Sequence, residues 1–359
     1  MKLGIIGLPN VGKSTLFNAL TGLKVETFNY PFCTISPNIG VVEVPDNRLD
    51  FLEKYYQSNN KIKTKIEFID IAGIIKGASN GEGLGNKFLH NIRETNAIIH
   101  IVRCFNTNTI SHVMGNVNPI RDIETINTEL ILSDLDIVIK KFDRLKNDFN
   151  VHYNYRAFLK KIMKHLNDGN PVRTIELNNN IEQYYLNRLY LITSKPVLYV
   201  CNVSESNLSC DNKYIQDVKD FAKNEHTYAI KICSKIEEEI ATLCANDRTI
   251  FLNEFGLQEP GLNYLIKCSY ELLQLITFFT AGKKEVRGWG IKKGSLITDA
   301  ANKIHSDFKK GFICAEIMRI DDLCKFKNEQ NVRNNGLIKI EGKEYLVNDG
   351  DIINFRFNV

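Results

Sequence analysis

The chain has 359 residues, of which 25% are charged and 43% hydrophobic, and its formal net charge is +4. This length allows two or three domains with cores of their own, so the fold needs neither a disulfide nor a structural metal. The net charge is too small to argue by itself for nucleic-acid binding.

The nine cysteines are scattered, with no C-x-x-C pair and no histidine at zinc-like spacing. We therefore expect reduced thiols and a cytoplasmic protein. The first predicted strand begins at Lys2, which leaves no room for a targeting peptide. No apolar run reaches the length of a membrane span, so we expect no membrane partner.

The first section of the chain alternates strand and helix patterns, as in a doubly wound α/β sheet with helices on both faces. The expected strands are residues 2–6, 40–44, 65–70 and 97–102, and the expected helices are residues 15–20 and 89–96.

From Ile120 the pattern changes to a helical period laced with charge. The expected helices are residues 120–145, 158–166 and 181–192, around a Gly-Asn-Pro turn at 169–171. The strand pattern resumes at residues 196–200 and 227–232, which predicts a helical hairpin inserted within the α/β domain.

Beyond Leu273 the composition becomes rich in strand-forming residues. The expected strands are residues 275–280, 285–291, 316–320, 336–340 and 352–357, with one helix over residues 297–308. This order predicts a small α+β module on a mixed sheet.

Residues 7–14 read G-L-P-N-V-G-K-S, a complete G-x-x-x-x-G-K-[ST] phosphate loop between the first strand and the first helix. In such a loop the backbone N–H groups cradle the phosphates, Lys13 reaches the β- and γ-phosphates and the Ser14 hydroxyl binds Mg²⁺. A glycine-rich turn is the structural alternative. The predicted nucleotide contacts here are Asn10, Val11, Gly12, Lys13, Ser14 and Thr15.

A second motif, I-E-F-I-D-I-A-G at residues 66–73, is an apolar strand that ends in Asp-x-x-Gly. It would place Asp70 near Mg²⁺ through water and the Gly73 N–H near the γ-phosphate. Thr34, between the first helix and the second strand, would supply a second hydroxyl to Mg²⁺. Without the phosphate loop, Asp70 would be interpreted as part of a turn at a strand end and Thr34 as an ordinary loop residue. Because both follow Lys13 in the order typical of P-loop proteins, a role in metal binding is favoured.

The third motif is N-V-S-E at residues 202–205, where GTP-binding proteins carry N-K-x-D. Val203 replaces the lysine that packs along the base, and Glu205 replaces the aspartate that pairs with guanine. A carboxylate one methylene longer misses that bidentate geometry, whereas Asn202 can offer its amide oxygen to an adenine amino group. The pattern therefore favours ATP, or relaxed specificity, with Ser234 of I-C-S-K in the last base-contacting loop.

These motifs, together with D-I-A-G-I-I-K-G-A and I-C-S-K-I-E, resemble the YchF / Obg-like ATPase family of the TRAFAC class of P-loop NTPases over nearly the whole chain. The resemblance implies a G domain in two parts (1–118 and 195–274), a helical coiled-coil insertion (119–194) and a C-terminal β-grasp (TGS) domain (275–359). It further implies ATPase activity and association with ribosomes or translation factors. Cys233 departs from the serine that the family usually has there.

Hydrolysis needs a group that orients the attacking water, often a glutamine directly after the Asp-x-x-Gly glycine. Ile74 stands there and cannot do so, which predicts a low intrinsic rate with Lys13 as the main catalytic group. The resemblance suggests two residues that could take the place of the missing glutamine. Asn10 would help to hold K⁺, and His112 would approach the γ-phosphate, although a structural imidazole is the simpler reading of a single histidine.

The C-terminal module begins with basic residues around Trp289, the only tryptophan. An exposed aromatic interleaved with charge suits contact with RNA, and a solvated strand edge is the alternative. The basic residues are Lys283, Lys284, Arg287, Lys292, Lys293, Lys303, Lys309 and Lys310.

The sequence therefore predicts a cytoplasmic, monomeric P-loop switch that binds Mg²⁺ and ATP, hydrolyses ATP slowly and docks to the large ribosomal subunit or to translation factors. Two alternatives stay open. One is a translational GTPase with a tolerant base pocket, and the other is an RNA-binding scaffold that holds nucleotide only for stability.

Overall fold

The structure, a computed structural model, describes residues 1–22, 39–71, 84–107, 109–145 and 153–358. The chain forms two compact units, and each is discontinuous in sequence. The first unit contains Met1–Val42 and Glu67–Leu265, and the second contains Glu43–Ile66 and Ile266–Val359. No helix in the described ranges is long and apolar enough to cross a membrane.

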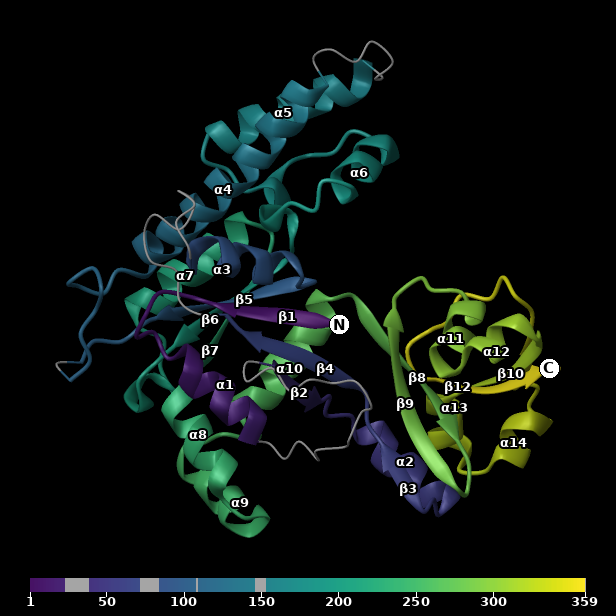
Figure 1. The fold of residues 1–359 in the computed structure, drawn as a ribbon. Helices are drawn as coiled ribbons and strands as arrows, with labels where there is room; N and C mark the ends of the chain where they lie inside the picture. The colour runs from purple at the N-terminus through teal and green to yellow at the C-terminus, as the bar shows by residue number, and fades with distance from the viewer. Residues whose placement is uncertain (23–38, 72–83, 108, 146–152, 359) are drawn as a thin grey trace. The chain divides into compact units, whose positions relative to one another are not determined.

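The first unit is built on a six-stranded sheet of order β2-β4-β1-β5-β6-β7 (Figure 1). β1 pairs in parallel with β4 and β5, and the parallel pairing continues through β6 to β7. Every residue of β5 and β6 is buried, as expected for central strands that are covered on both faces. The strands are β1 (Lys2–Ile6), β2 (Ile39–Glu43), β4 (Lys65–Asp70), β5 (Ala97–Arg103), β6 (Val197–Asn202) and β7 (Ala229–Ile232).

Helices cover both faces of this sheet, and α1 packs against α8 on one of them (Figure 1). The helices are α1 (Lys13–Gly22), α3 (Leu84–Arg93), α4 (Pro119–Arg144), α5 (Tyr153–Asn167), α6 (Asn180–Asn187), α7 (Lys213–Asn224), α8 (Ser234–Thr242), α9 (Ala245–Glu254) and α10 (Gly261–Leu272). Short 3-10 turns are η2 (Val172–Thr174), η3 (Ile192–Ser194) and η4 (Glu205–Asn207). The predicted doubly wound α/β architecture is confirmed.

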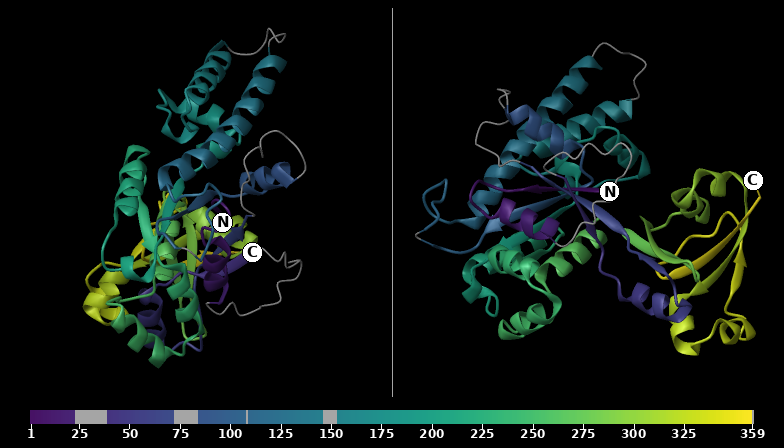
Figure 2. Two further views of the ribbon diagram at one scale, coloured as in Figure 1. Left: turned by 90° about the vertical axis from the view of Figure 1, so that its left-hand side faces the viewer. Right: turned by 60° about the horizontal axis from the view of Figure 1, so that its bottom comes forward.

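The helical insertion has a core of its own, and α4 and α5 run side by side (Figure 2). α4 begins at Pro119 because the Asn118 side chain accepts a hydrogen bond from the Arg121 N–H, an N-cap followed by proline in the first turn. The core residues come from all three helices and the turns between them: Ile131, Val138, Phe158, Leu159, Ile162, Leu166, Val172, Leu186, Leu189 and Leu191. The predicted helical hairpin is confirmed, although the expected helix over residues 181–192 ends at Asn187.

The second unit carries a mixed sheet of order β11-β10-β12-β8-β9-β3. The central strands β8 and β12 are parallel to each other, β10 is antiparallel to β11 and β12, and β9 is antiparallel to β8. This confirms the predicted α+β module. Its strands are β3 (Asn60–Ile62), β8 (Leu275–Ala281), β9 (Glu285–Lys292), β10 (Phe312–Arg319), β11 (Lys339–Glu341) and β12 (Asp351–Phe357), and its helices are α2 (Asn47–Tyr56), α11 (Ile297–Ile304), α12 (Ser306–Lys310), α13 (Ile320–Phe326) and α14 (Glu329–Asn334).

The segment Glu43–Ile66 belongs to this second unit, whereas the sequence analysis kept it with the first part of the G domain. Its α2 buries Leu49 and Leu52 against Phe279 of β8, and its β3 pairs in parallel with β9. The expected helix over residues 297–308 is also divided, because His305 has an extended backbone with φ of −160° between α11 and α12.

Candidate nucleotide site

The phosphate loop connects the buried strand β1 to α1, which begins at Lys13. Gly12 has φ of +98°, and Asn10 has φ of 62°, so two loop residues adopt the left-handed region. A Cβ atom on Gly12 would lie 2.3 Å from Asn202 Nδ2, so only glycine fits there. The loop is therefore shaped as the motif predicts.

Lys13 lies buried within this loop, and its side chain is 7% exposed. Its Nζ donates hydrogen bonds to the Gly7 carbonyl at 3.1 Å and the Leu8 carbonyl at 2.8 Å. Burial lowers the pKa of Lys13 to about 8, and the negative charge of Asp70 opposes that shift. The ammonium group is thus held at the loop by neutral carbonyls, which a phosphate oxygen can replace as a stronger partner.

Asp70, at the end of β4, stands beside Ser14 in the first turn of α1. Burial raises the pKa of Asp70, while the charge of Lys13 and a hydrogen bond with Ser14 lower it. Its Oδ1 is buried and has no hydrogen-bond partner among the described residues. A free carboxylate oxygen next to a hydroxyl is the type of oxygen donor set that suits Mg²⁺.

Of the remaining residues that were predicted to bind phosphate or metal, some lie within the described ranges and others lie outside them. Val11 is buried in the loop, and Thr15 is half-buried in the first turn of α1. Thr34, Gly73 and Ile74 lie outside the described residues. The described ranges contain no group of three or more His, Cys, Asp or Glu side chains that could hold a metal.

Asn202, the last residue of β6, is buried and joins two loops of the site. Its Nδ2 donates to the Val11 carbonyl at 2.8 Å, and its Oδ1 accepts from the Ser234 N–H at 3.0 Å. Both ends of the amide therefore bind the protein itself. This positioning role was not visible in the sequence pattern.

The base-side residues are brought together at the same end of the sheet. Val203 is 2% exposed, and its N–H bonds to the Ile232 carbonyl at 2.9 Å. The Ser234 hydroxyl is buried without a hydrogen-bond partner in the described structure. Glu205 accepts a hydrogen bond from Lys235 Nζ at 2.8 Å. The sequence pattern gives no role to Lys235, because its partner lies 30 residues away in the chain.

Asn10 of the phosphate loop contacts the loop that follows β5, one residue before His112. Asn10 Nδ2 lies 3.5 Å from the Ser111 carbonyl, next to His112. The His112 ring is engaged at both nitrogens, because Nδ1 accepts from the Met114 N–H at 3.1 Å and Nε2 lies 2.8 Å from Asp122 Oδ2. This geometry favours a structural imidazole that fastens the loop to α4.

The expectation that Trp289 is exposed is wrong. Its indole is half-buried, stacks on Phe278 with an interplanar angle of 12° and donates from Nε1 to Thr280 Oγ1 at 2.9 Å. The Arg287 guanidinium lies 4.0 Å from the ring centroid and covers it. A cross-strand hydrogen bond and core packing hold the ring, which the composition of the segment did not reveal.

Two family models match the chain. One, described as a 50S ribosome-binding GTPase, matches residues 2–141. The other, YchF-GTPase_C, is described as a protein of unknown function and matches residues 275–358.

Full-length relatives are similar over the whole chain. The Ribosome-binding ATPase YchF of Bacillus subtilis (strain 168) is 48% identical, with 99% of each chain covered. That of Escherichia coli O157:H7 is 47% identical and covers 100% of this chain and 99% of its own. Among solved structures, the Schizosaccharomyces pombe YchF GTPase superposes with a TM-score of 0.89 at 36% identity, covering 99% of this chain and 97% of that one.

Proposed function

This chain belongs to the YchF family of P-loop NTPases, and we propose that it is a nucleotide-operated switch that prefers ATP to GTP and hydrolyses it slowly. The relatives at 48% and 47% identity are named ribosome-binding ATPases. The observation that carries the base preference is the ion pair between Glu205 and Lys235.

Guanine recognition requires a free carboxylate that accepts from N1–H and the exocyclic amine together. Glu205 is one methylene longer than the usual aspartate, and one of its oxygens already accepts from Lys235. Pairing with guanine would compete with Lys235 for that carboxylate. The Asn202 oxygen accepts one hydrogen bond, from Ser234, and a carbonyl oxygen has a second lone pair that can accept from an adenine amino group.

Competition between ATP and GTP for a fluorescent ATP analogue tests this preference, with Mg²⁺ present. Wild type should prefer ATP, and Glu205→Asp should shift the ATP/GTP ratio towards GTP by about tenfold, equivalent to about 1.4 kcal/mol. Lys235→Met serves as the matched variant that frees Glu205 without shortening it. A preference of the wild type for GTP would refute the proposed base preference and favour the alternative of a translational GTPase. Val203→Lys is avoided because a charge would be buried at a residue that is 2% exposed.

The phosphate and metal roles are proposed for residues of the loop and of β4. Backbone N–H groups of residues 10–15 bind the phosphates, and Lys13 moves from its carbonyl partners to the β- and γ-phosphates. Ser14 and Asp70 would hold Mg²⁺, the latter through water, with Thr34 as a further hydroxyl ligand. When bound, the metal neutralises charge on the phosphate oxygens.

Hydrolysis is proposed to be slow because Ile74 cannot orient water. Asn10 is proposed to help hold K⁺, since its amide oxygen has no partner among the hydrogen bonds of the described residues. A catalytic role for His112 would require the ring to leave Asp122, and stimulation by K⁺ or by a partner is the simpler route. The scaffold alternative would be refuted by partner-stimulated turnover that Lys13→Ala abolishes.

We propose the domain division 1–118, 119–194, 195–274 and 275–359, with a coiled-coil insertion and a C-terminal TGS domain of the β-grasp type. The segment 43–66, which joins the second unit, would be an excursion from the first part. The mixed sheet with parallel central strands supports the β-grasp assignment.

The partner is proposed to be the ribosome or a translation factor, bound by a monomer in the cytoplasm. The described structure leaves Lys283, Lys284, Lys292, Lys293 and Lys303 exposed for contact with RNA phosphates. Affinity for ribosomes should then fall with rising salt, and it should fall less steeply after substitution of these lysines by glutamine.

A further inference from the structure

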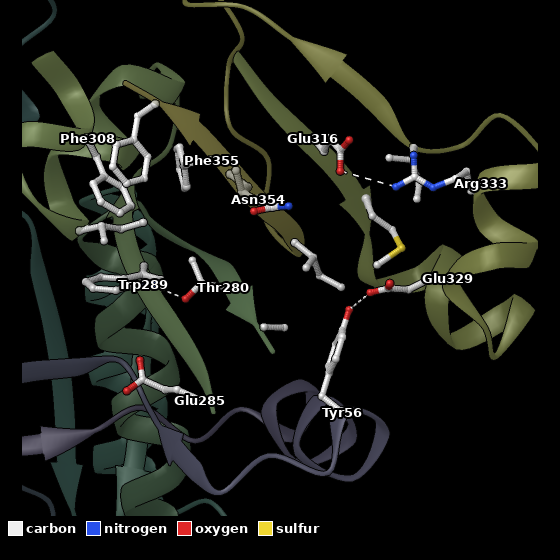
Figure 3. A pocket seen from close by; sticks show the side chains of 17 residues that line it. Tyr56, Thr280, Glu285, Trp289, Phe308, Glu316, Glu329, Arg333, Asn354 and Phe355 are labelled. Atoms are coloured by element: carbon white, nitrogen blue, oxygen red, sulfur yellow. Dashed lines mark hydrogen bonds and ion pairs between the residues drawn. The ribbon is translucent and has the colours of Figure 1, made fainter. Parts of the chain in front are cut away.

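The second unit contains a cavity of about 600 Å³, a size within the range of ligand-binding pockets (Figure 3). It lies on the mixed sheet and is lined by residues of α2, β8, β9, α11, α12, β10, α14 and β12. Side chains from both faces of the sheet reach it, since Ile352 and Ile353, neighbours in β12 that point to opposite faces, both line the cavity. The cavity is therefore lined by residues of the cores on both faces of the sheet.

The strands β8 and β12 border the cavity and are paired over only a short stretch. These parallel strands pair at Phe279 and Ile352, and the Gly350 N–H also bonds to the Thr277 carbonyl at 2.9 Å. Past that point, β8 is paired along its length with β9, and β12 continues to Phe357 paired with β10. In the described structure the edge of β12 that faces β8 has no registered partner over residues 353–357, whereas only Thr280 and Ala281 of β8 remain beyond Phe279.

Unpaired strand edges present a row of N–H and C=O groups that template another strand. Residues 353–357 span about 17 Å at roughly 3.3 Å per residue, which is the length of a short strand. An extended segment in this gap would pair with the open edge of β12.

The two walls of the cavity differ in chemistry (Figure 3). One wall is aromatic, with Trp289, Phe308 and Phe355. The opposite wall carries Tyr56, whose hydroxyl donates to Glu329. Because successive side chains of a strand point to opposite faces, such walls select alternating side chains.

The carboxylates determine the charge of the occupant. Glu316 is neutralised by Arg356 at 2.5 Å and Arg333 at 3.5 Å. Glu285 and Glu329 also line the cavity and have no cation in contact among the described residues. A basic side chain is the complement of this pair of acids.

We propose that the gap between β8 and β12 binds an extended, basic peptide segment of a partner protein by strand addition. Apolar side chains of the segment contact Trp289, Phe308 and Phe355, and lysine or arginine side chains face Glu285 and Glu329. Main-chain hydrogen bonds to the open edge of β12 supply affinity, and the pockets for alternate side chains supply specificity. This site is separate from the nucleotide site and does not depend on the proposed ATPase activity.

The full chain reports occupancy by itself, because its only tryptophan lines the cavity. The probes are acetylated, amidated peptides of about seven residues, a usual strand length, with apolar residues alternating with lysine. A matched set carries glutamate in place of lysine. Members of the lysine set should change Trp289 fluorescence saturably, and members of the glutamate set should not. Absence of any saturable lysine peptide would overturn the proposal.

Backbone recognition and charge recognition are tested separately. N-methylation of alternate amides in the best lysine peptide should weaken its binding by about tenfold, the effect of lost main-chain hydrogen bonds. Glu285→Gln should weaken it by up to about fivefold, whereas Glu344→Gln, an exposed residue outside the cavity, should leave it unchanged. The proposal would be refuted if the N-methylated peptide bound as tightly as the unmodified one. It would also be refuted if an RNA oligonucleotide displaced the lysine peptide, or if the protein formed a dimer that the peptides do not dissociate.

Discussion

ATP affinity should depend on pH through Lys13. Burial lowers the pKa of this lysine to about 8 in the free protein, and a bound triphosphate would raise it because the phosphate charges favour the ammonium form. Below pH 8 the lysine is already charged, so the affinity for ATP should not change with pH. Above pH 8 each binding event must take up a proton, and the affinity should fall about tenfold per pH unit, which is about 1.4 kcal/mol.

Isothermal titration calorimetry measures this uptake directly. At pH 9, binding in buffers of different ionisation enthalpy should show uptake of about one proton, whereas at pH 7 it should show almost none. Lys13→Arg keeps its charge at both pH values and should bind ATP with an affinity that does not fall between them. Equal affinity of wild type at pH 7 and pH 9, with no proton uptake, would refute the reasoning.

Three further predictions concern stability and the role of His112. Gly290→Ala should destabilise the protein by about 1–3 kcal/mol, because the new Cβ would lie 2.7 Å from the Tyr270 hydroxyl, whereas Gly282→Ala, with open space around it, should be nearly neutral in thermal denaturation. His112→Gln and Asp122→Asn should lower the melting temperature alike and leave ATP turnover within about twofold of wild type, since less than about 0.5 kcal/mol of barrier would change; a large loss of turnover in His112→Gln alone would make the histidine catalytic. Burial raises the pKa of Glu237, with hydrogen bonds from the α10 N-terminus opposing the shift. The folded state thus holds that proton more tightly than the unfolded state, so stability should fall as pH rises through the ordinary glutamate pKa towards the raised one, a slope that Glu237→Gln should remove in denaturant titrations at several pH values.

Local patterns predicted the strand, the loop and the helix that surround the phosphate motif, whereas the binding roles of the loop residues stay predictions. The loop conformation depends on neighbouring residues, so the strand, the glycines and Lys13 are readable from a short stretch of sequence. The position of Asp70 followed from the parallel pairing of β1 and β4, which puts both strand ends at one edge of the sheet.

Contacts between distant segments were not predictable from periodicity. The pairing of β3 with β9 joins residues more than two hundred positions apart, and α2 and β3 show no sequence mark of their partner. The same limit applies to Glu205 with Lys235 and to the burial of Trp289, where the partner determines the role of the side chain.

The discontinuous second unit has a consequence for synthesis on the ribosome. The segment Glu43–Ile66 emerges first, but the strands that cover Leu49 and Leu52 begin at Leu275. Synthesis proceeds at about 5–20 residues per second, so this apolar face stays uncovered for roughly 10–40 s before its partner strands are made. The apolar face of α2 is therefore exposed during most of the elongation of the nascent chain. During this time we expect chaperones to bind it.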